Sequence, residues 1–237
     1  MEAKTTITQI GNTPLIKLKQ PSELTGCNIY GKAEYFNPGQ SVKDRAALFI
    51  VQDAIKKKLI TKGGTIVEGT AGNTGIGLAI VCKEYGLNLK IVIPKTQSIE
   101  KKKTLKELGA ELIEVDAVPY INPKNYIKQS KEIAEDLNKK NSNGVYWANQ
   151  FDNIINTEAH IQTTSQEIWN QTAGSVDAFT CAVGTGGTLA GVSIGLKEKN
   201  KNIKIALSDP MGSSLYSHIK TNKLISSGNS ITEGIGK

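Results

Sequence analysis

The sequence predicts an α/β fold with two open, twisted, mainly parallel sheets that are covered by helices. Short apolar segments alternate along the chain with segments in which apolar residues recur at helical spacing. The connections between these segments are a few residues long, and many contain glycine. Hydrophobic residues make up 38% of the 237 residues, which is sufficient for a sizeable core. We therefore expect a globular chain rather than a disordered one.

A first series of elements runs from about residue 15 to residue 138. Strands are expected at Leu15–Leu18, Ile29–Tyr35, Thr65–Val67, Leu89–Ile93 and Leu112–Val115. Helices are expected at Arg45–Ile60, Thr74–Tyr85, Lys101–Leu108 and Pro123–Asn138. Gly86 and Gly109 end two of the helices, and Pro94 closes a strand. Strands separated by helices are typical of a parallel sheet.

A second series is expected to begin at Val145. Its strands are predicted at Tyr146–Ala148, Ala178–Val183 and Ile203–Leu207. Its helices are predicted at Ile154–Trp169 and Gly187–Lys197, with a short one at Leu215–His218. The chain then stops at residues 234–237 without a closing helix or strand. Either this terminus is loose, or further sequence once followed it.

Charge and cysteine content exclude several classes of protein. The net charge is +7, but the lysines are spread over helix-like segments and no RNA-binding motif accompanies them. The three cysteines, Cys27, Cys82 and Cys181, are far apart, and His160 and His218 are isolated, which argues against a disulfide framework or a metal site. No signal peptide and no apolar run of about 18 residues is found. We expect a cytoplasmic protein with neither a nucleic-acid nor a membrane partner.

Lys43 is the first candidate for chemistry. A turn at Asn37-Pro38-Gly39 leads into a helix whose first turn contains Lys43. The positive end of the helix dipole disfavours an ammonium group and favours the neutral amine that a covalent lysine nucleophile needs. The alternative is an ordinary surface lysine on a helix that Ser41 caps.

A glycine-rich loop follows the predicted strand at Thr65–Val67. The segment from Glu68 to Gly77 combines small residues and hydroxyls with the start of a helix, and free backbone N–H groups there can bind an anion. Its glycines resemble a dinucleotide-binding motif with altered spacing. A nucleotide-binding domain and a plain strand-to-helix turn are therefore the alternatives.

A second glycine-rich loop, Gly184-Thr185-Gly186-Gly187-Thr188, follows the predicted strand that ends at Val183. N–H groups and hydroxyls at a helix start form a phosphate cradle, and the loop lacks the Lys-Ser/Thr ending of a Walker motif. A lysine amine, an anion loop and a phosphate cradle together suit a cofactor with an aldehyde and a phosphate, and a substrate with a carboxylate.

In this combination the sequence resembles the fold-type-II family of pyridoxal 5'-phosphate (PLP) enzymes, which have a tryptophan synthase β-like fold, and within it the cysteine synthases (O-acetylserine sulfhydrylases). Five segments carry the resemblance in order: Gly11–Leu15, Asn37–Arg45, Thr70–Gly75, Gln150–Asn153 and Gly184–Thr188. Ala71 departs from the serine that is common in the family, so one substrate contact is expected to change. The family continues beyond Gly234-Ile235-Gly236, and we therefore expect a C-terminal part to be missing.

The resemblance implies a role for each matching residue. Lys43 would bind PLP covalently and exchange a proton with the substrate α-carbon, and Asn73 would contact the ring oxygen of the cofactor. The phosphate would be held by Gly184, Thr185, Gly186, Gly187 and Thr188. The substrate would be bound by Thr70, Ala71, Gly72, Asn73, Thr74, Gln150 and Gly234.

The resemblance also implies an activity and an organisation. The expected reaction converts O-acetylserine and sulfide to cysteine and acetate. A smaller mobile domain is expected at residues 37–148, and a larger PLP-binding domain at residues 1–36 and 149–237. A homodimer and the docking of serine acetyltransferase are implied as well. The alternatives are a cystathionine β-synthase, a serine or threonine dehydratase of the same fold, or a non-catalytic binding partner.

Overall fold

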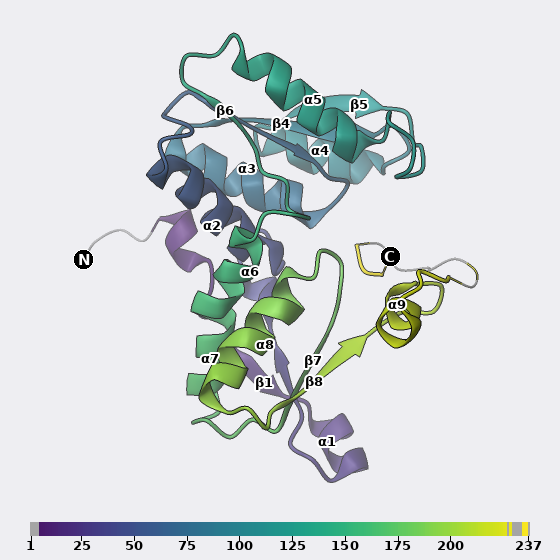
Figure 1. Cartoon of the computed structure of the whole chain (residues 1–237). Helices are drawn as coiled ribbons and strands as arrows, with labels where there is room; N and C mark the ends of the chain where they lie inside the picture. Colours follow the sequence, from purple (N-terminus) through teal and green to yellow (C-terminus); the bar gives the residue numbers. More distant parts are fainter. Residues whose placement is uncertain (1–4, 227, 229–233, 237) are drawn as a thin grey trace. The chain divides into compact units, whose positions relative to one another are not determined.

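The computed structural model describes residues 5–226, 228 and 234–236 (Figure 1). The chain separates into two compact units, Met1–Ile155 and Asn156–Lys237. Each unit has its own sheet and its own hydrophobic core.

A four-stranded parallel sheet forms the centre of the first unit. Its strands are β3 (Thr65–Gly69), β4 (Asn88–Pro94), β5 (Glu111–Val115) and β6 (Val145–Trp147), in the order β5-β4-β3-β6. Every residue of β3 is buried, because this strand has neighbours on both sides and helices over both faces. Its short, nearly continuous apolar run is what such a position requires.

Helices cover the two faces of this sheet (Figure 1). They are α2 (Lys43–Lys56), α3 (Asn73–Tyr85), α4 (Ile99–Glu107) and α5 (Tyr126–Asn138). On one face Ile66 and Ile91 pack with residues of α2, α3 and α4. On the other face Val67 and Val92 pack with Ala134 of α5. The alternation along β3 and β4 follows from the two-residue period of a strand.

The N-terminal part of this unit is a separate hairpin-like arrangement. Strands β1 (Leu15–Lys17) and β2 (Tyr30–Lys32) are antiparallel, with α1 (Lys19–Thr25) between them. Two short 3₁₀ helices, η1 (Thr6–Gln9) and η2 (Glu34–Phe36), flank the pair. The strand expected at 29–35 is therefore shorter than predicted, because η2 already begins at Glu34.

The second unit contains a two-stranded parallel sheet and a layer of helices. Its elements are the π-helix η3 (His160–Thr164), α7 (Ser165–Gln171), β7 (Ala178–Ala182), α8 (Gly187–Lys199), β8 (Lys204–Ser208) and α9 (Leu215–Thr221), after α6 (Ile155–Ala159). Ile168, Val192 and Leu196 form its core together with Ile203. Gly195 has no room for a side chain, because Ser165 lies against it. This contact lets α8 approach the preceding helices closely.

The predicted α/β class with parallel sheets and covering helices is confirmed. The strand at 145–147, with which the second series was expected to begin, pairs with β3 and so belongs to the four-stranded sheet. Hydrophobic periodicity predicts strands but does not decide which strands are neighbours.

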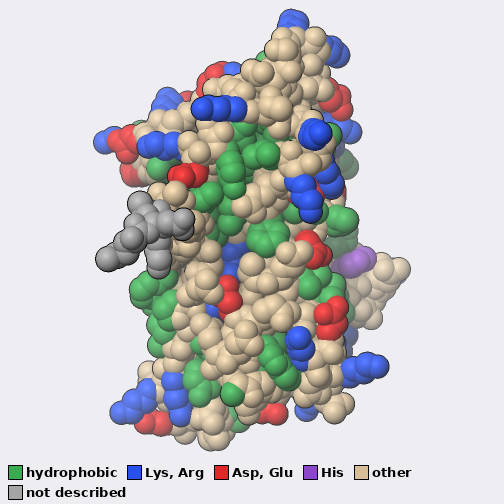
Figure 2. All heavy atoms as spheres, turned by 90° about the vertical axis from the view of Figure 1, so that its left-hand side faces the viewer, with side chains coloured by type: hydrophobic (Ala, Val, Ile, Leu, Met, Phe, Trp, Pro, Cys, Tyr) green, Lys and Arg blue, Asp and Glu red, His purple; other side chains and the backbone are tan. Residues whose placement is uncertain are grey.

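Charged side chains are dispersed on the face that Figure 2 shows. Lysine and arginine side chains lie among aspartates and glutamates there instead of gathering in one patch. None of the helices within the described ranges is both long enough and apolar enough to cross a bilayer.

Candidate functional site

Lys43 is the first residue of α2 and is half-buried. The turn before it is closed by a hydrogen bond from Gln40 N to Asn37 O at 2.8 Å. Asn37 Nδ2 also donates to the backbone oxygen of Ser41 at 3.0 Å. The Ser41 hydroxyl accepts from the backbone N–H of Lys43 at 3.2 Å. These bonds hold the backbone at Lys43 in a defined position.

A buried ion pair supports the same turn. Arg45 is 1% exposed, and its Nε and Nη2 each lie 2.8 Å from an oxygen of Glu34. Asn37 donates to the same carboxylate at 2.9 Å. Burial raises the pKa of Glu34, but the hydrogen bond and charge of Arg45 outweigh it and hold that pKa below its ordinary value. Glu34 is therefore an anionic anchor for the segment that carries Lys43.

The N-terminal motif Gly11–Leu15 is attached to this anchor. The Thr13 hydroxyl donates to Glu34 at 2.7 Å, and Gly11 N donates to Asn37 Oδ1 at 2.8 Å. Arg45 donates to the Thr13 hydroxyl at 3.1 Å. Two segments that look independent in the sequence thus form one hydrogen-bonded cluster.

Asp44, next to Lys43, is fully buried. Its carboxyl accepts a short hydrogen bond from Gly39 N, and a side chain at Gly39 would overlap it. Burial raises the pKa of Asp44 to about 6, and the nearby Glu34 charge adds to that effect. The sequence did not indicate a role for Asp44, but its buried carboxyl stabilises the turn before Lys43 through the hydrogen bond from Gly39 N.

The starts of α2 and α3 lie against each other. A Cβ atom placed on Gly77, in the second turn of α3, would come within 3.1 Å of the Asp44 Cα atom. Only glycine allows the helices to approach this closely. The segment carrying Lys43 and the loop that opens α3 are therefore neighbours in the first unit.

That loop is residues 69–74, at the carboxyl end of β3. The Thr70 hydroxyl accepts from Gly72 N at 3.3 Å, and Ala71 O accepts from Gln97 Nε2 at 2.8 Å. Gly72 precedes the helix without a side-chain cap, and a Cβ atom there would meet nothing within 4 Å. Asn73 is exposed. The loop thus presents N–H groups at the start of a 13-residue helix, which is an arrangement that binds anions.

Gln150 is connected to this loop. The Thr74 hydroxyl donates to Gln150 Oε1 at 2.6 Å, and both side chains are buried. Seventy-six residues separate the two in sequence. The two segments that were both expected to bind the substrate carboxylate are thus brought together.

Glu68 is a residue that the sequence interpretation did not single out as functional. Its side chain is buried near the end of β3, and burial raises its pKa to about 8. Backbone N–H groups of Gln150 and Asn149 and the side chain of Gln150 hydrogen-bond its carboxyl. A glutamate inside an otherwise apolar strand is the signal that could have identified it.

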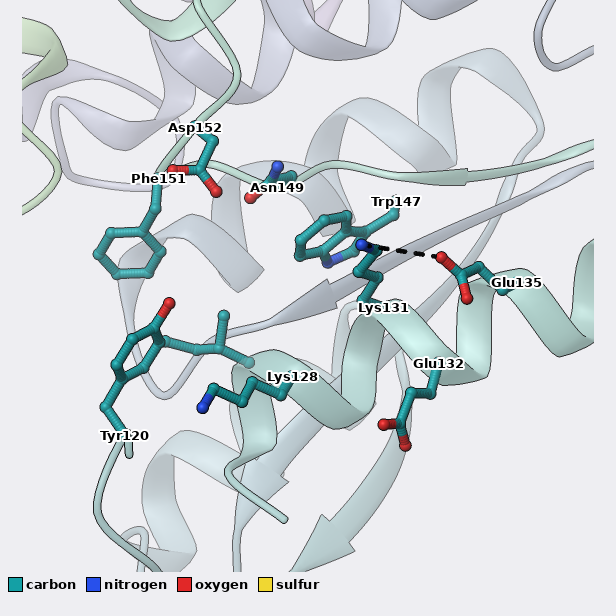
Figure 3. A pocket seen from close by; sticks show the side chains of 10 residues that line it. Tyr120, Lys128, Lys131, Glu132, Glu135, Trp147, Asn149, Phe151 and Asp152 are labelled. Atoms are coloured by element: carbon teal, nitrogen blue, oxygen red, sulfur yellow. Dashed lines mark ion pairs between the residues drawn. The ribbon is translucent and has the colours of Figure 1, made fainter. Parts of the chain in front are cut away.

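A pocket of about 390 Å³ lies beside the glutamine segment, on the α5 side of the sheet (Figure 3). Tyr120, Trp147 and Phe151 supply aromatic walls, and Lys128 and Lys131 of α5 point toward it. Lys128 lies 5.0 Å from the Tyr120 ring centre. Asn149 and Phe151 line this pocket, whereas Gln150 between them is directed to Thr74.

The second unit carries the other predicted loop, Gly184–Thr188, between β7 and α8. Gly186 is the N-cap of α8 with φ +93°, a left-handed conformation that favours glycine. The Thr185 hydroxyl accepts from Gly187 N at 3.3 Å. The 13-residue helix therefore starts with backbone N–H groups that can donate hydrogen bonds to a phosphate.

Two residues of the preceding helices support this loop, and neither was predicted to take part. Asn156 Nδ2 donates to the Thr185 hydroxyl at 2.9 Å, and its side chain abuts Gly187. His160, one of the two isolated histidines, is 1% exposed, and its Nε2 lies 3.1 Å from the Thr188 hydroxyl. Asn156 and His160 thus orient both threonines of the loop.

Gly234 lies against the start of this loop. Its backbone oxygen touches the position that a side chain at Gly184 would occupy. Gly236 N donates to Val183 O at 2.8 Å. The described residues 234–236 thus run beside the loop.

The predicted site residues form two groups. Lys43, Thr70–Thr74 and Gln150 belong to the first unit, and Gly184–Thr188 with Gly234 belong to the second. Within the described ranges, no group of three or more His, Cys, Asp or Glu side chains is placed to hold a metal ion.

Comparisons with known proteins agree with this geometry. Residues 7–237 match the family model described as "Pyridoxal-phosphate dependent enzyme". "Cysteine synthase 1" of Neurospora crassa is 57% identical over 96% of this chain and 60% of its own length. The protein of the same name from Emericella nidulans is 56% identical over 96% of this chain and 61% of its own length.

A solved structure is similar along the whole chain. The O-acetylserine dependent cystathionine β-synthase from Helicobacter pylori is 34% identical, with a TM-score of 0.85, over 100% of this chain and 73% of its own. The chain spans about 60% of the length of the curated relatives that it matches. With the family model matching nearly its full length, the chain belongs to the family of pyridoxal-phosphate-dependent enzymes.

Proposed function

We propose that this chain carries out the chemistry of a cysteine synthase, a β-replacement that converts O-acetylserine and sulfide to cysteine and acetate. One observation carries the proposal: the helix that starts with Lys43 and the helix that starts with Asn73 pack together near their N-termini, with Gly77 against Asp44. An amine and a carboxylate-binding loop in one compact unit are what chemistry at the α-carbon of an amino acid requires. The names of the relatives that are 57% and 56% identical support the same reaction.

The residues present fit PLP. The Gly184–Thr188 loop offers N–H groups at a helix start, and Thr185, which accepts two hydrogen bonds, still has its own O–H to donate. Lys43 would hold the aldehyde end, and Asn73 would contact the ring oxygen. Bound PLP supplies an electron sink that stabilises negative charge at the substrate α-carbon.

Lys43 would then move the proton at the α-carbon. A neutral amine is needed for this, and the N-terminus of α2 disfavours the charged form. The bonds from Ser41 and Asn37 fix the backbone from which this side chain extends. Positioning of this kind converts an amine into a base with a defined target.

Substrate binding would fall to the loop that opens α3. Thr70, Ala71, Gly72, Asn73, Thr74 and Gln150 would surround the α-carboxylate, and Gly234 would belong to the substrate-binding residues near the cofactor ring. Asn73 is exposed and no side chain caps α3, so the N–H groups of its first turn can donate hydrogen bonds to a carboxylate. Ala71 places a methyl group in this loop where the resemblance expects a hydroxyl.

The test uses the purified chain with added PLP. We expect a visible absorption band of the lysine-bound cofactor, and cysteine production from O-acetylserine and sulfide. Lys43→Ala should abolish both, while Lys56→Ala, at the far end of the same helix, should leave both unchanged. A band that persists without Lys43 removes that residue from the proposed role.

The second candidate is a cystathionine β-synthase. The similarity to the Helicobacter pylori enzyme of that name favours it, since the fold is shared along the whole chain. Sulfide and homocysteine would use the same first half-reaction. Supplying each acceptor separately to the PLP-loaded chain, and identifying the product by mass, distinguishes the two.

Organisation and location are part of the same proposal. We infer a mobile domain at residues 37–148 against a larger PLP-binding part, a homodimer, the docking of serine acetyltransferase and a cytoplasmic location. All of these rest on the family likeness. Sedimentation of the purified chain alone, and then with the C-terminal peptide of a serine acetyltransferase, tests the two assembly statements.

A further inference from the structure

Glu68 is a buried acid at the base of the loop that is proposed to bind the substrate carboxylate. It is 1% exposed, and one of its oxygens, Oε2, has no hydrogen-bond partner among the described residues. A carboxylate in this position loses its hydration without gaining a cation, which is a large cost. The cost falls when the group is protonated, in agreement with the pKa of about 8 that burial produces.

The contacts of Glu68 lead to the binding loop. Backbone N–H groups of Gln150 and Asn149 and the side chain of Gln150 hydrogen-bond its carboxyl. A glutamine amide has donors on its nitrogen and acceptors on its oxygen. Because the Gln150 side chain is held at Glu68, its Oε1 accepts from the Thr74 hydroxyl at 2.6 Å. The chain of bonds runs from β3 to the first turn of α3.

We propose that Glu68 is a positioning residue for the carboxylate-binding loop, which fixes the Thr74 hydroxyl through Gln150. A protonated Glu68 adds no negative charge to the surroundings of this loop. The inference rests on the proposed function for its ligand, an α-amino acid. Gln150 then has a second role besides substrate binding, because it connects the protonation state of Glu68 with the position of the Thr74 hydroxyl.

The surroundings of Glu68 explain why the charge of its carboxyl would affect the carboxylate-binding loop. Ile91 lies opposite it on β4, Thr74 lies at the end of the chain of bonds on α3, and Asn149 and Gln150 follow β6. Within the described residues, the groups that act on this carboxyl besides burial are the amides of Asn149 and Gln150. An ionised Glu68 would therefore be uncompensated and would repel a bound carboxylate.

The first test follows the chain of bonds without any substrate. In the full chain loaded with PLP, NMR signals of the Gln150 side-chain amide and the Thr74 methyl group are recorded from about pH 6 to about pH 10. We expect both to titrate with one midpoint in the wild type and neither to do so in Glu68→Gln, which keeps the size of the side chain. Glu84→Gln, on the exposed end of α3, is the matched control and should behave as wild type.

Thr74→Val provides a second variant. Valine keeps the shape of threonine and removes its hydroxyl, so the Gln150 amide should still titrate while amino-acid affinity falls at every pH. Absence of titration in the wild type, or titration that persists in Glu68→Gln, overturns the proposal. Because absence of titration in the wild type is by itself sufficient to overturn the proposal, the test stays decisive even where Glu68→Gln folds poorly.

The second test measures amino-acid binding from the change in the cofactor spectrum. The ratio of the wild-type dissociation constant to that of Glu68→Gln should rise about tenfold between about pH 7 and about pH 9, as one pKa unit of coupling implies. A ratio that stays flat contradicts the proposal. If the wild type binds no amino acid while the NMR signals still titrate together, the proposed function fails and the positioning role of Glu68 stands.

Discussion

Arg45 and Glu34 form a buried bidentate ion pair, in which Nε and Nη2 of the arginine each lie 2.8 Å from a carboxylate oxygen. The pair joins the start of α2 to the 3₁₀ helix η2, and it connects the N-terminal motif to the turn that carries Lys43. It is therefore the main structural support of the proposed catalytic lysine.

Removing one partner of this pair should destabilise the first unit strongly. Arg45→Ala leaves the partly buried Glu34 carboxylate without its cation, and the loss of one partner from a buried pair typically costs about 3–5 kcal/mol. Urea unfolding followed by circular dichroism measures the change. Lys103→Ala, which breaks an exposed pair with Glu107 on α4, is the control and should leave the midpoint unchanged. Equal effects of the two variants would contradict this account.

Asp44 should make the stability of the fold depend on pH. Its pKa is about 6 in the folded chain against an ordinary value of 3.8, so the folded state binds more protons than the unfolded state between these values. The contribution of Asp44 to the free energy of unfolding is therefore greatest below about pH 4. It falls by about 2–3 kcal/mol as the pH rises through about 6. Asp44→Asn should remove this slope.

The measurement for Asp44 is a series of urea unfolding curves from about pH 4 to about pH 7. The difference in unfolding free energy between wild type and Asp44→Asn should change across this range and level off above it. Asp152→Asn, at an exposed position of the same unit, serves as a control. A wild-type slope that survives in Asp44→Asn would assign the titration to another group.

Asn156→Asp should weaken the binding of PLP. The aspartate carboxylate cannot donate to the Thr185 hydroxyl, and it brings a negative charge next to a loop proposed to hold a phosphate. We expect at least about a tenfold loss of affinity, equivalent to about 1.4 kcal/mol. Equilibrium dialysis with PLP measures it, and Asn170→Asp on α7 is the control. Unchanged affinity would show that Asn156 does not orient the loop.

The three cysteines should differ in reactivity. Cys82 is buried in the core of the first unit, and burial raises the pKa of its thiol to about 12, so the reactive thiolate is scarce near neutral pH. Cys27 is exposed and should react rapidly with a disulfide reagent. Cys82 should react only after denaturation, and Cys82→Ala should remove that late phase. Rapid labelling at Cys82 in the folded chain, identified by peptide mass, would contradict its burial.

Much of the fold was predictable because local patterns determine it. The apolar run of β3 and the helical spacing in α2 and α3 are visible in the sequence, and each appears in the structure near its predicted position. The helix expected to begin at Pro123 starts instead at Tyr126, where the Asn125 side chain accepts from Ile127 N at 3.0 Å. Caps of this kind shift a boundary without changing the element.

Cys181 shows the limit of such patterns. Its place in the apolar strand expected at Ala178–Val183 predicts a buried side chain, but in the described second unit it is only partly buried. Burial depends on what covers a strand, and β7 has β8 as its neighbour in a two-stranded sheet. An apolar segment indicates a strand, whereas its cover is a property of the assembled chain.

The sequence alone determined the order of strands and helices, the glycine-rich loops at helix starts and the lysine next to a turn, because each depends on residues that are neighbours along the chain. Only the tertiary structure decided that β6 pairs with β3 and that the Gln150 side chain accepts a hydrogen bond from the Thr74 hydroxyl. The burial of Glu68 was likewise decided only by the packing of the chain. These facts depend on contacts between distant segments, and a buried group acquires its pKa and its hydrogen-bond partners only when those segments pack.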